Sequence, residues 1–331
     1  MGLRMNNRLE HLLSIWHEGQ RRFQWILATV IETQGSSYRK PGAMMLINDM
    51  SQYFGLISGG CLESDVMTKV RKCWDTGHSQ VVCYDMREED DIGWQLGIGC
   101  GGMVKILLQP ITESNNFLSL EALHQGLLNR QTCYYLQSLD SLFPHNRILT
   151  KQPSFLDDNC IVHTCKPRPA ITIFGGGVDA QPVCKIAATL GWHITLVDER
   201  VNYARAAYFP DADSIIKKPF NELARSDWLQ QIDAAVIMTH NVRLDGLALK
   251  LVQNSSAQYV GLLGPKHRAQ KVFESARLPA AAMTKTLFNP IGLDIGGELP
   301  ESIALSILSE AHAVLEGKQS AAQCTSLKDV S

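Results

Sequence analysis

The sequence has no apolar stretch as long as a membrane-spanning helix and no basic run interleaved with aromatic residues. A transmembrane helix needs about 20 consecutive apolar residues, and a nucleic-acid-binding face needs clustered positive charge. The formal net charge of −2 gives no overall field that would attract a polyanion. The first residues show neither a secretory signal nor a myristoylation pattern. We therefore expect a soluble, cytoplasmic protein with no nucleic-acid or membrane partner.

The nine cysteines lack C-x-x-C pairs and lack a nearby histidine at metal-binding spacing. An odd number of scattered cysteines does not suit a disulfide framework, and a structural zinc site needs four clustered ligands. We expect reduced thiols and no metal site. Cys73, Cys83, Cys133 and Cys184 lie in helical or strand patterns and are most simply small core residues.

The chain of 331 residues is long enough for two hydrophobic cores. The first half mixes short apolar strands with helices, whereas the second half alternates strands with helices, which is typical of a doubly wound parallel sheet. The predicted fold is α/β, with an N-terminal α+β domain followed by a C-terminal Rossmann-like domain. The expected parts are a first domain at 1–112, a connecting segment with a helix, a strand and a proline-containing linker at 113–169, a Rossmann-like domain at 170–317 and a tail at 318–331.

A glycine loop opens the second domain. Gly175, Gly177 and Ala180 satisfy G-x-G-x-x-A after the apolar run ITIF, and Asp198 ends the next predicted strand. This context is typical of a dinucleotide-binding strand–turn–helix unit. Asp179, however, puts a carboxylate at the helix N-terminus, where it either caps free N–H groups or repels an anion. The loop is therefore either a nucleotide site or only a tight turn.

Other polar residues follow the later predicted strands, where a Rossmann-like fold collects its ligands. His240 ends the fourth strand, and Lys266 follows the fifth at a predicted helix start. Asp294 lies among three glycines ahead of a long helix, which suggests close approach of this backbone to a ligand or to the other domain. Lys266 on a solvated helix face and His240 as a core-edge histidine remain equally open.

Two cysteines of the first domain are embedded in glycine turns. Cys61 follows Gly59 and Gly60 at a predicted helix start, and Cys100 lies in the run GIGCGG. A helix N-terminus favours a thiolate, but nearby carboxylates at Glu63 and Asp65 oppose it. The two thiols are either contacts to a bound group or buried core residues.

The segment from 33 to 47, TQGSSYRKPGAMMLI, precedes both cysteines. Ser36, Ser37 and Arg39 could hold an anion through hydroxyls, backbone and charge. A polar hairpin loop explains the same residues, because serine and glycine commonly form turns.

These motifs resemble the XdhC/CoxI family, the maturation factors of xanthine dehydrogenase and carbon monoxide dehydrogenase. The resemblance rests on ATVIETQGSSYRKPGAMMLI, GLISGGCLES and GIGCGG in the first domain and on IFGGGVDAQPV, LGWHITLVDER, VIMTHN, YVGLLGPKHR and PIGLDIGGELPESIALSILSE in the second. It runs from about residue 24 to 316 and is weakest between 110 and 168.

The resemblance implies a chaperone that binds molybdenum cofactor, protects it while a cysteine desulfurase installs its terminal sulfur, and inserts it into a xanthine dehydrogenase-type apo-molybdoenzyme. It implies that Cys61 and Cys100 match the family's glycine-flanked cysteines and that one or both touch the cofactor. Such a protein is an accessory factor rather than a turnover enzyme, and it is a monomer or a homodimer.

Two other hypotheses remain at this point. An NAD(P)-dependent oxidoreductase would use Gly175, Gly177 and Asp198, with a nucleotide or dinucleotide in the Rossmann-like domain. An interaction module would only dock a desulfurase and a dehydrogenase, and it would need neither Cys61 nor Cys100.

Overall fold

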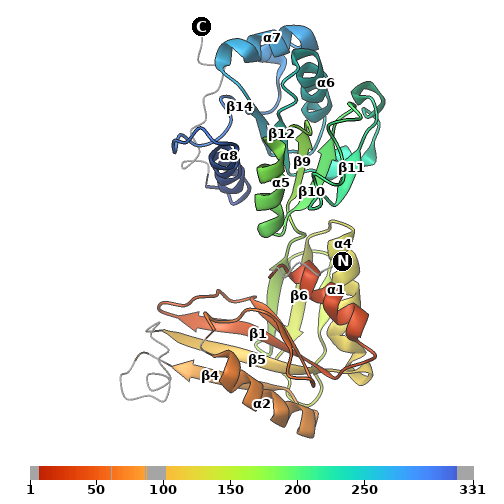
Figure 1. Cartoon of the computed structure of the whole chain (residues 1–331). Helices are drawn as coiled ribbons and strands as arrows, with labels where there is room; N and C mark the ends of the chain where they lie inside the picture. The colour runs from red at the N-terminus through yellow and green to blue at the C-terminus, as the bar shows by residue number, and fades with distance from the viewer. Residues whose placement is uncertain (1–6, 61, 86, 88–101, 319–331) are drawn as a thin grey trace. The chain divides into compact units, whose positions relative to one another are not determined.

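The computed structural model describes residues 7–60, 62–85, 87 and 102–318 and divides the chain into two compact units, at 1–168 and 169–331 (Figure 1). The division falls inside the run KPRP, between Arg168 and Pro169. Residues 319–331, which make up nearly all of the expected tail, lie outside the described residues. Each unit is described by itself below.

The first unit contains a five-stranded antiparallel sheet in the order β3-β2-β1-β5-β4. Its elements are β1 Trp25–Gln34, β2 Met44–Asn48, β3 Tyr53–Gly55, β4 Gln80–Asp85 and β5 Met103–Ile111, with helix α2 Glu63–Thr76 between β3 and β4. Side chains alternate across a strand, so Ile26 and Ala28 of β1 pack with α2 whereas Trp25 and Leu27 face the other core. Burial of both faces explains why β1 reads as a continuous apolar run.

The second face of this sheet is covered by residues far apart in the chain. Helices α1 Leu9–Gly19 and α4 Leu120–Leu128 lie side by side and share a core with β1 and β2 (Figure 1). After the 3-10 helix η1 Glu113–Ser119 and α4, a three-stranded sheet follows in the order β7-β6-β8, with β6 Cys133–Ser138, β7 Arg147–Leu149 and β8 Cys160–Cys165. Leu123 and Leu127 of α4 and Tyr135 of β6 are buried in the same core as Leu13 and Trp16 of α1.

The segment 113–168 is thus part of the first unit, which differs from the expected connecting segment. The sequence signal was weak because β7 has only three residues and because β6 and β8 have six residues each and are separated by a long polar stretch. Packing against α1, which lies more than a hundred residues earlier, holds this region in place.

The second unit is built on a six-stranded parallel sheet in the order β11-β10-β9-β12-β13-β14. The strands are β9 Ala170–Phe174, β10 His193–Val197, β11 Ser214–Ile216, β12 Ala234–Ile237, β13 Tyr259–Leu262 and β14 Leu287–Phe288. In chain order this is 3-2-1-4-5-6, the Rossmann order, and it confirms the predicted doubly wound sheet.

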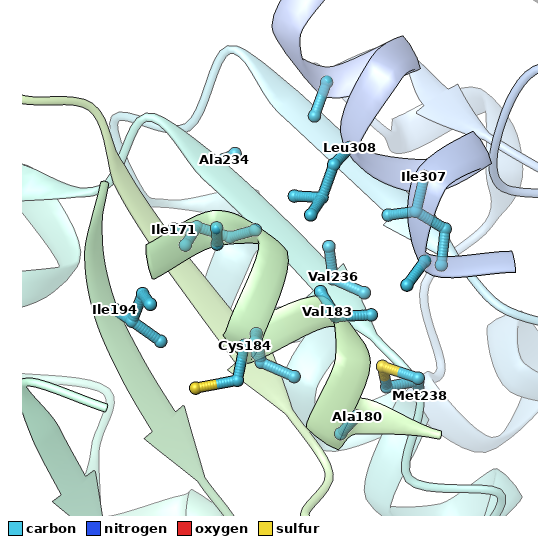
Figure 2. Packing of buried hydrophobic residues seen from close by; sticks show 14 of the residues in the cluster. Ile171, Ala180, Val183, Cys184, Ile194, Ala234, Val236, Met238, Ile307 and Leu308 are labelled. Atoms are coloured by element: carbon cyan, nitrogen blue, oxygen red, sulfur yellow. The ribbon is translucent and has the colours of Figure 1, made fainter. Parts of the chain in front are cut away.

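Helices cover both faces of the parallel sheet. On one face, α5 Ala180–Thr189 and α8 Pro300–Leu315 pack Val183, Cys184, Ile307 and Leu308 against the strands (Figure 2). On the other face lie α6 Val242–Gln253 and α7 Lys266–Ala276. Three short 3-10 helices complete the unit, η2 Phe220–Glu222, η3 Asp227–Gln231 and η4 Ala280–Ala282. Among the described helices of both units, none is long and apolar enough to cross a membrane.

Candidate functional site

Three loops of the first unit meet at one end of its five-stranded sheet. The register pairs Gln34 of β1 with Met103 of β5, and Met103 with Asp85 of β4, so these three residues share one end. Strand β3 also finishes there, because Gly55 pairs with Met45 near the start of β2. The topology therefore brings together the loop from 35 to 43, the loop from 56 to 62 and the residues that flank 88–101.

Close backbone contacts hold the loop from 35 to 43 against the other two. A Cβ built on Gly102 would lie 2.0 Å from the Ser36 carbonyl oxygen, and one on Gly59 would lie 3.6 Å from the Tyr38 ring. No side chain fits at Gly102, because real Cβ atoms essentially never come within 3.0 Å of another heavy atom. Glycine at 102 is thus required by close packing onto the loop that carries Ser36.

Cys61 and Cys100 lie outside the described residues, but the chain beside Cys61 is well organised. Ser58 Oγ accepts hydrogen bonds from the N–H groups of Gly60 and Leu62 at 3.2 and 3.1 Å and donates to the buried Glu63 carboxylate. Glu63 also accepts from the Ser58 N–H at 3.1 Å. Gly60 has a φ of +105°, which disfavours any side chain there. The Ser58–Glu63 pair therefore fixes the backbone on both sides of position 61.

Ser37 and Arg39 lie in the loop from 35 to 43 as the sequence predicted, and Ser36 is exposed beside them. The Ser37 hydroxyl oxygen is buried and has no hydrogen-bond partner within the described residues. A buried polar group without a partner is costly, and binding of a ligand can remove that cost. The donor set of this loop, two hydroxyls and a guanidinium, suits an anionic ligand.

The remaining described cysteines of the first unit fall into two groups. Burial raises the pKa of Cys73 to about 11 and that of Cys165 to about 12, and it also raises the pKa of Cys133. These buried thiols stay protonated and are poor nucleophiles. Cys184 of the second unit is buried as well, but Cys83 is exposed. The prediction that Cys83 fills a core is wrong, because β4 is an edge strand that buries Val82 and turns Cys83 outward.

Other segments of the second unit pack directly against its glycine loop. A Cβ on Gly175 would lie 2.5 Å from the Met238 carbonyl oxygen, and one on Gly176 would lie 2.9 Å from the carbonyl carbon of Tyr203. At Gly177 the nearest atom would be Asp179 Oδ1 at 2.8 Å. Gly175 and Gly176 are therefore required by the neighbouring backbone at 203–204 and 238–239, which is sufficient reason for these two glycines without a ligand, whereas a Cβ on Gly177 would meet only the end of the Asp179 side chain.

Asp198 ends β10 as predicted, but it is fully buried and already paired. It accepts hydrogen bonds from the N–H of Gly176 at 2.8 Å and from Arg200 Nε and Nη2 at 2.9 and 2.7 Å. The Arg200 guanidinium lies 3.7 Å from the centre of the Tyr203 ring. In a dinucleotide site this carboxylate binds the ribose hydroxyls, so here the position that would receive the ribose is taken by Arg200.

Asp179 and His240 form an ion pair across the start of α5. The Asp179 side chain makes no capping hydrogen bond to the helix, which differs from the expected alternatives of a cap or a free, repelling carboxylate. The hydrogen bond that His240 Nε2 donates to the Asp179 carboxylate raises the pKa of His240 above its ordinary value of 6.5. His240 has a left-handed φ of 59° and an exposed side chain, so it is not a core-edge histidine.

The Asp179–His240 pair predicts a pH dependence. Because the pKa of His240 is raised in the folded chain, the pair stabilises the fold below pH 6.5, and this contribution is lost as the pH rises through the folded-state pKa. We expect Asp179→Asn to lower the His240 pKa, measured by NMR titration of its ring. The stability change should stay below about 1 kcal/mol because the His240 side chain is 60% exposed. A Glu222→Gln control should leave the His240 titration unchanged, and an unaltered pKa in Asp179→Asn would contradict the pairing.

No contact within the described residues joins Lys266 or Asp294 to the Asp179–His240 pair. Lys266 is the exposed first residue of α7, and Asp294 is exposed in the loop before α8. Two of the glycines around Asp294 pack on the helix, since Cβ atoms at Gly292 and Gly297 would lie 2.3 and 2.4 Å from Ser306 and Ser302 of α8, whereas a Cβ on Gly296 would meet nothing within 4 Å. Close approach of this backbone to a ligand or to the other domain stays a prediction.

Sequence reasoning missed two buried carboxylates of the second unit and the partners that hold them. Asp245 of α6 is fully buried and accepts from Thr239 Oγ1 at 2.6 Å and from Arg268 of α7. Glu310 of α8 is also buried and accepts from Tyr259 Oη at 2.7 Å, and burial raises its pKa. Within the part of the chain that the structure describes, no group of three His, Cys, Asp or Glu side chains could hold a metal ion.

Comparison with known proteins matches both units. The family model described as the XdhC Rossmann domain matches residues 171–311, and the one described as the XdhC and CoxI family matches residues 18–85. A crystal structure described as a xanthine dehydrogenase from Bacillus halodurans is similar with a TM-score of 0.81 and 28% identity, over 97% of this chain and 98% of that one.

Two known proteins are similar over most of the chain. A probable xanthine dehydrogenase subunit of Bacillus subtilis (strain 168) is 29% identical over 306 residues, which is 86% of this chain and 91% of that protein. The molybdenum cofactor insertion chaperone PaoD of Escherichia coli (strain K12) is 22% identical over 301 residues, which is 87% of this chain and 83% of that protein.

Proposed function

Because this chain belongs to the XdhC and CoxI family, we propose that it is a molybdenum cofactor insertion chaperone. The observation that carries the proposal is the extent of the likeness to a relative named for this role, which spans 87% of this chain and so includes both units. The proposal therefore rests on both units of the chain. It does not rest on the Rossmann fold alone, which proteins of many unrelated activities share.

The local structure supports a cofactor contact in the first unit. The described residues next to Cys61 and Cys100 converge on one end of the five-stranded sheet, beside a loop with an unpartnered hydroxyl at Ser37. Soft thiolates suit a sulfur-rich metal cofactor, and hydroxyls with Arg39 suit its phosphate. We include in the proposal that one or both thiols touch the bound cofactor.

The finer parts of the proposal come from the family resemblance. The cofactor is carried in its sulfurated form, a cysteine desulfurase supplies the sulfur, and a xanthine dehydrogenase-type apo-enzyme in the cytoplasm receives it. The protein acts as an accessory factor alone or as a homodimer. It does not turn over a nicotinamide substrate, because Asp198 is engaged by Arg200 and Asp179 by His240.

The test is cofactor retention by the purified full chain, measured as fluorescence of the oxidised pterin after gel filtration. Wild type should retain the cofactor, and Cys61→Ser or Cys100→Ser should reduce retention about tenfold, the factor that corresponds to losing one contact worth about 1.4 kcal/mol. Cys83→Ser is the matched control, because Cys83 is an exposed thiol of the same unit. A wild-type protein that never retains supplied cofactor contradicts the function, and equal retention in all four proteins contradicts the role of the two thiols.

A further inference from the structure

The first unit contains a pocket that residues 39 and 41–44 of the loop and the start of β2 help to line. Its volume is about 530 Å³, within the roughly 300 to 1,000 Å³ of ordinary ligand pockets. The start of α1, the loop at 39–44 and strand β8 form its walls. Two backbone hydrogen bonds hold the loop wall in place. The Val30 N–H donates to the Ala43 carbonyl at 2.9 Å, and the Gly42 N–H donates to the Val30 carbonyl at 2.8 Å.

The pocket wall is cationic. Arg8, Arg39 and Lys166 line it, and no acidic residue is among the described lining residues. The nearest acid in sequence, Glu10 in the first turn of α1, is engaged by Arg168 at 2.9 Å. Helix α1 begins at this wall without a side-chain cap, so the positive end of its dipole adds to the positive charge.

One acceptor faces this positive wall, at His163 of β8. The side chain is only 6% exposed, and its Nε2 is hydrogen bonded to Gln137 Oε1 at 2.9 Å. Its Nδ1 has no partner within the described residues and lies at the pocket wall. Gly42 keeps this atom accessible, since a Cβ there would lie 3.3 Å from Nδ1, and the φ of +93° at Gly42 disfavours a side chain.

A chain of buried amides determines which His163 nitrogen carries the proton. Gln109 Nε2 must donate to the Ser138 carbonyl, at 2.9 Å, so Gln109 Oε1 faces Gln137 and accepts from its Nε2 at 2.8 Å. Gln137 Oε1 is then an acceptor and requires a proton on His163 Nε2. Burial lowers the pKa of His163 to about 4, so near neutral pH the ring is uncharged and Nδ1 is an acceptor.

An acceptor next to several cations matches a ligand that has both an N–H donor and an anionic group. A free phosphate ion or a carboxylate would use the cations but leave His163 Nδ1 without a donor. A phosphorylated heterocycle with ring N–H groups satisfies both parts of the wall. The loop that carries Arg39 also contacts Gly59 through Tyr38 and Gly102 through Ser36, so one loop connects the pocket with the segments beside Cys61 and Cys100.

We propose that this pocket, lined by Arg8, Arg39, His163 and Lys166, binds the phosphate-bearing pterin of the cofactor, an inference that rests on the proposed function. Arg39 and Lys166 hold the phosphate, and His163 Nδ1 accepts a hydrogen bond from a pterin N–H. The metal-bearing end of the cofactor then extends along the loop from 35 to 43 toward the glycine-flanked segments.

The experiment compares the full chain with the Arg39→Gln/Lys166→Gln double variant and with His163→Gln. Glutamine at 163 keeps an N–H donor for Gln137 and replaces the imidazole, so that the Nδ1 acceptor is lost from its position beside Gly42. The matched control is Arg71→Gln/Lys72→Gln, which removes two exposed cations of α2 in the same unit. Two ligands are used, the oxidised phosphorylated pterin released from the cofactor and the same pterin after phosphatase treatment, with fluorescence polarisation as the measurement.

Wild type and the control should bind the phosphorylated pterin at least about tenfold more tightly than the dephosphorylated one, because each charge-assisted contact is worth about a factor of ten. The Arg39/Lys166 variant should lose that preference, and His163→Gln should weaken the binding of both pterins equally.

Cofactor retention by the double variant at the wild-type level would overturn the assignment of the pocket while leaving the proposed function in place. Failure of wild type to retain any cofactor removes the function and, with it, this ligand. Calorimetry with inorganic pyrophosphate then separates two cases. An anion site binds pyrophosphate in the control but not in the double variant, whereas a pocket without affinity for anions binds it in neither.

Discussion

Asp198→Ala is expected to destabilise the second unit by about 3 kcal/mol and to leave nicotinamide binding unchanged at an undetectable level. Asp198 is fully buried and accepts from Arg200 and from the Gly176 backbone, so its removal leaves a largely buried guanidinium and an N–H without their acceptor. Removing one partner of a buried ion pair costs about 3 to 5 kcal/mol, and the partial exposure of Arg200 favours the lower end. For a unit of this size the melting temperature should fall by roughly 6 to 12 °C.

The measurement is thermal unfolding of the full chain by circular dichroism, together with titration of NADH and NADPH fluorescence. Asp227→Ala is the matched control, because Asp227 is exposed in the same unit and its loss should change stability by less than about 0.5 kcal/mol. Micromolar dinucleotide binding by wild type that disappears in Asp198→Ala, with an unchanged melting temperature, would instead support the oxidoreductase hypothesis.

Ser58→Ala is expected to lower the stability of the first unit by about 2 to 4 kcal/mol and to reduce cofactor retention. The change removes the acceptor of the Gly60 and Leu62 N–H groups and a donor to the buried Glu63 carboxylate. Each buried group left without its partner costs about 1 to 3 kcal/mol. The backbone on both sides of position 61 then loses its fixed geometry, so we expect this variant to retain less cofactor.

Thermal unfolding and pterin retention of the full chain measure both effects. Ser64→Ala serves as the control, since Ser64 is an exposed serine in the first turn of the same helix. If Ser58→Ala kept the wild-type melting temperature, the Ser58–Glu63 pair would not hold the loop. If it lost stability and retained cofactor fully, the geometry around position 61 would be irrelevant to binding.

Local pattern was sufficient to predict most elements of the fold. The apolar runs at 171–174, 233–240 and 258–264 became β9, β12 and β13, and the alternation of strands with helices led to the parallel sheet. Right-handed crossovers restrict the order of such strands to a few choices. Gly77 ends α2 in a left-handed conformation, which is common for a glycine that follows a helical pattern.

Longer-range packing decided what the local pattern could not. The sequence alone determined the two-unit α/β fold, the glycine turns and the family motifs, because these depend on backbone preference and on burial repeated over a few residues. Only the tertiary structure joined 113–168 to the first unit, brought the Gly176 N–H to Asp198 and turned Cys83 toward solvent. It also brought His163 and Arg39, which are far apart in the chain, to one pocket. Contacts between side chains that are far apart in the chain depend on how the helices and strands pack and on which buried donors still need an acceptor. The spacing of residues along the chain predicts neither of these.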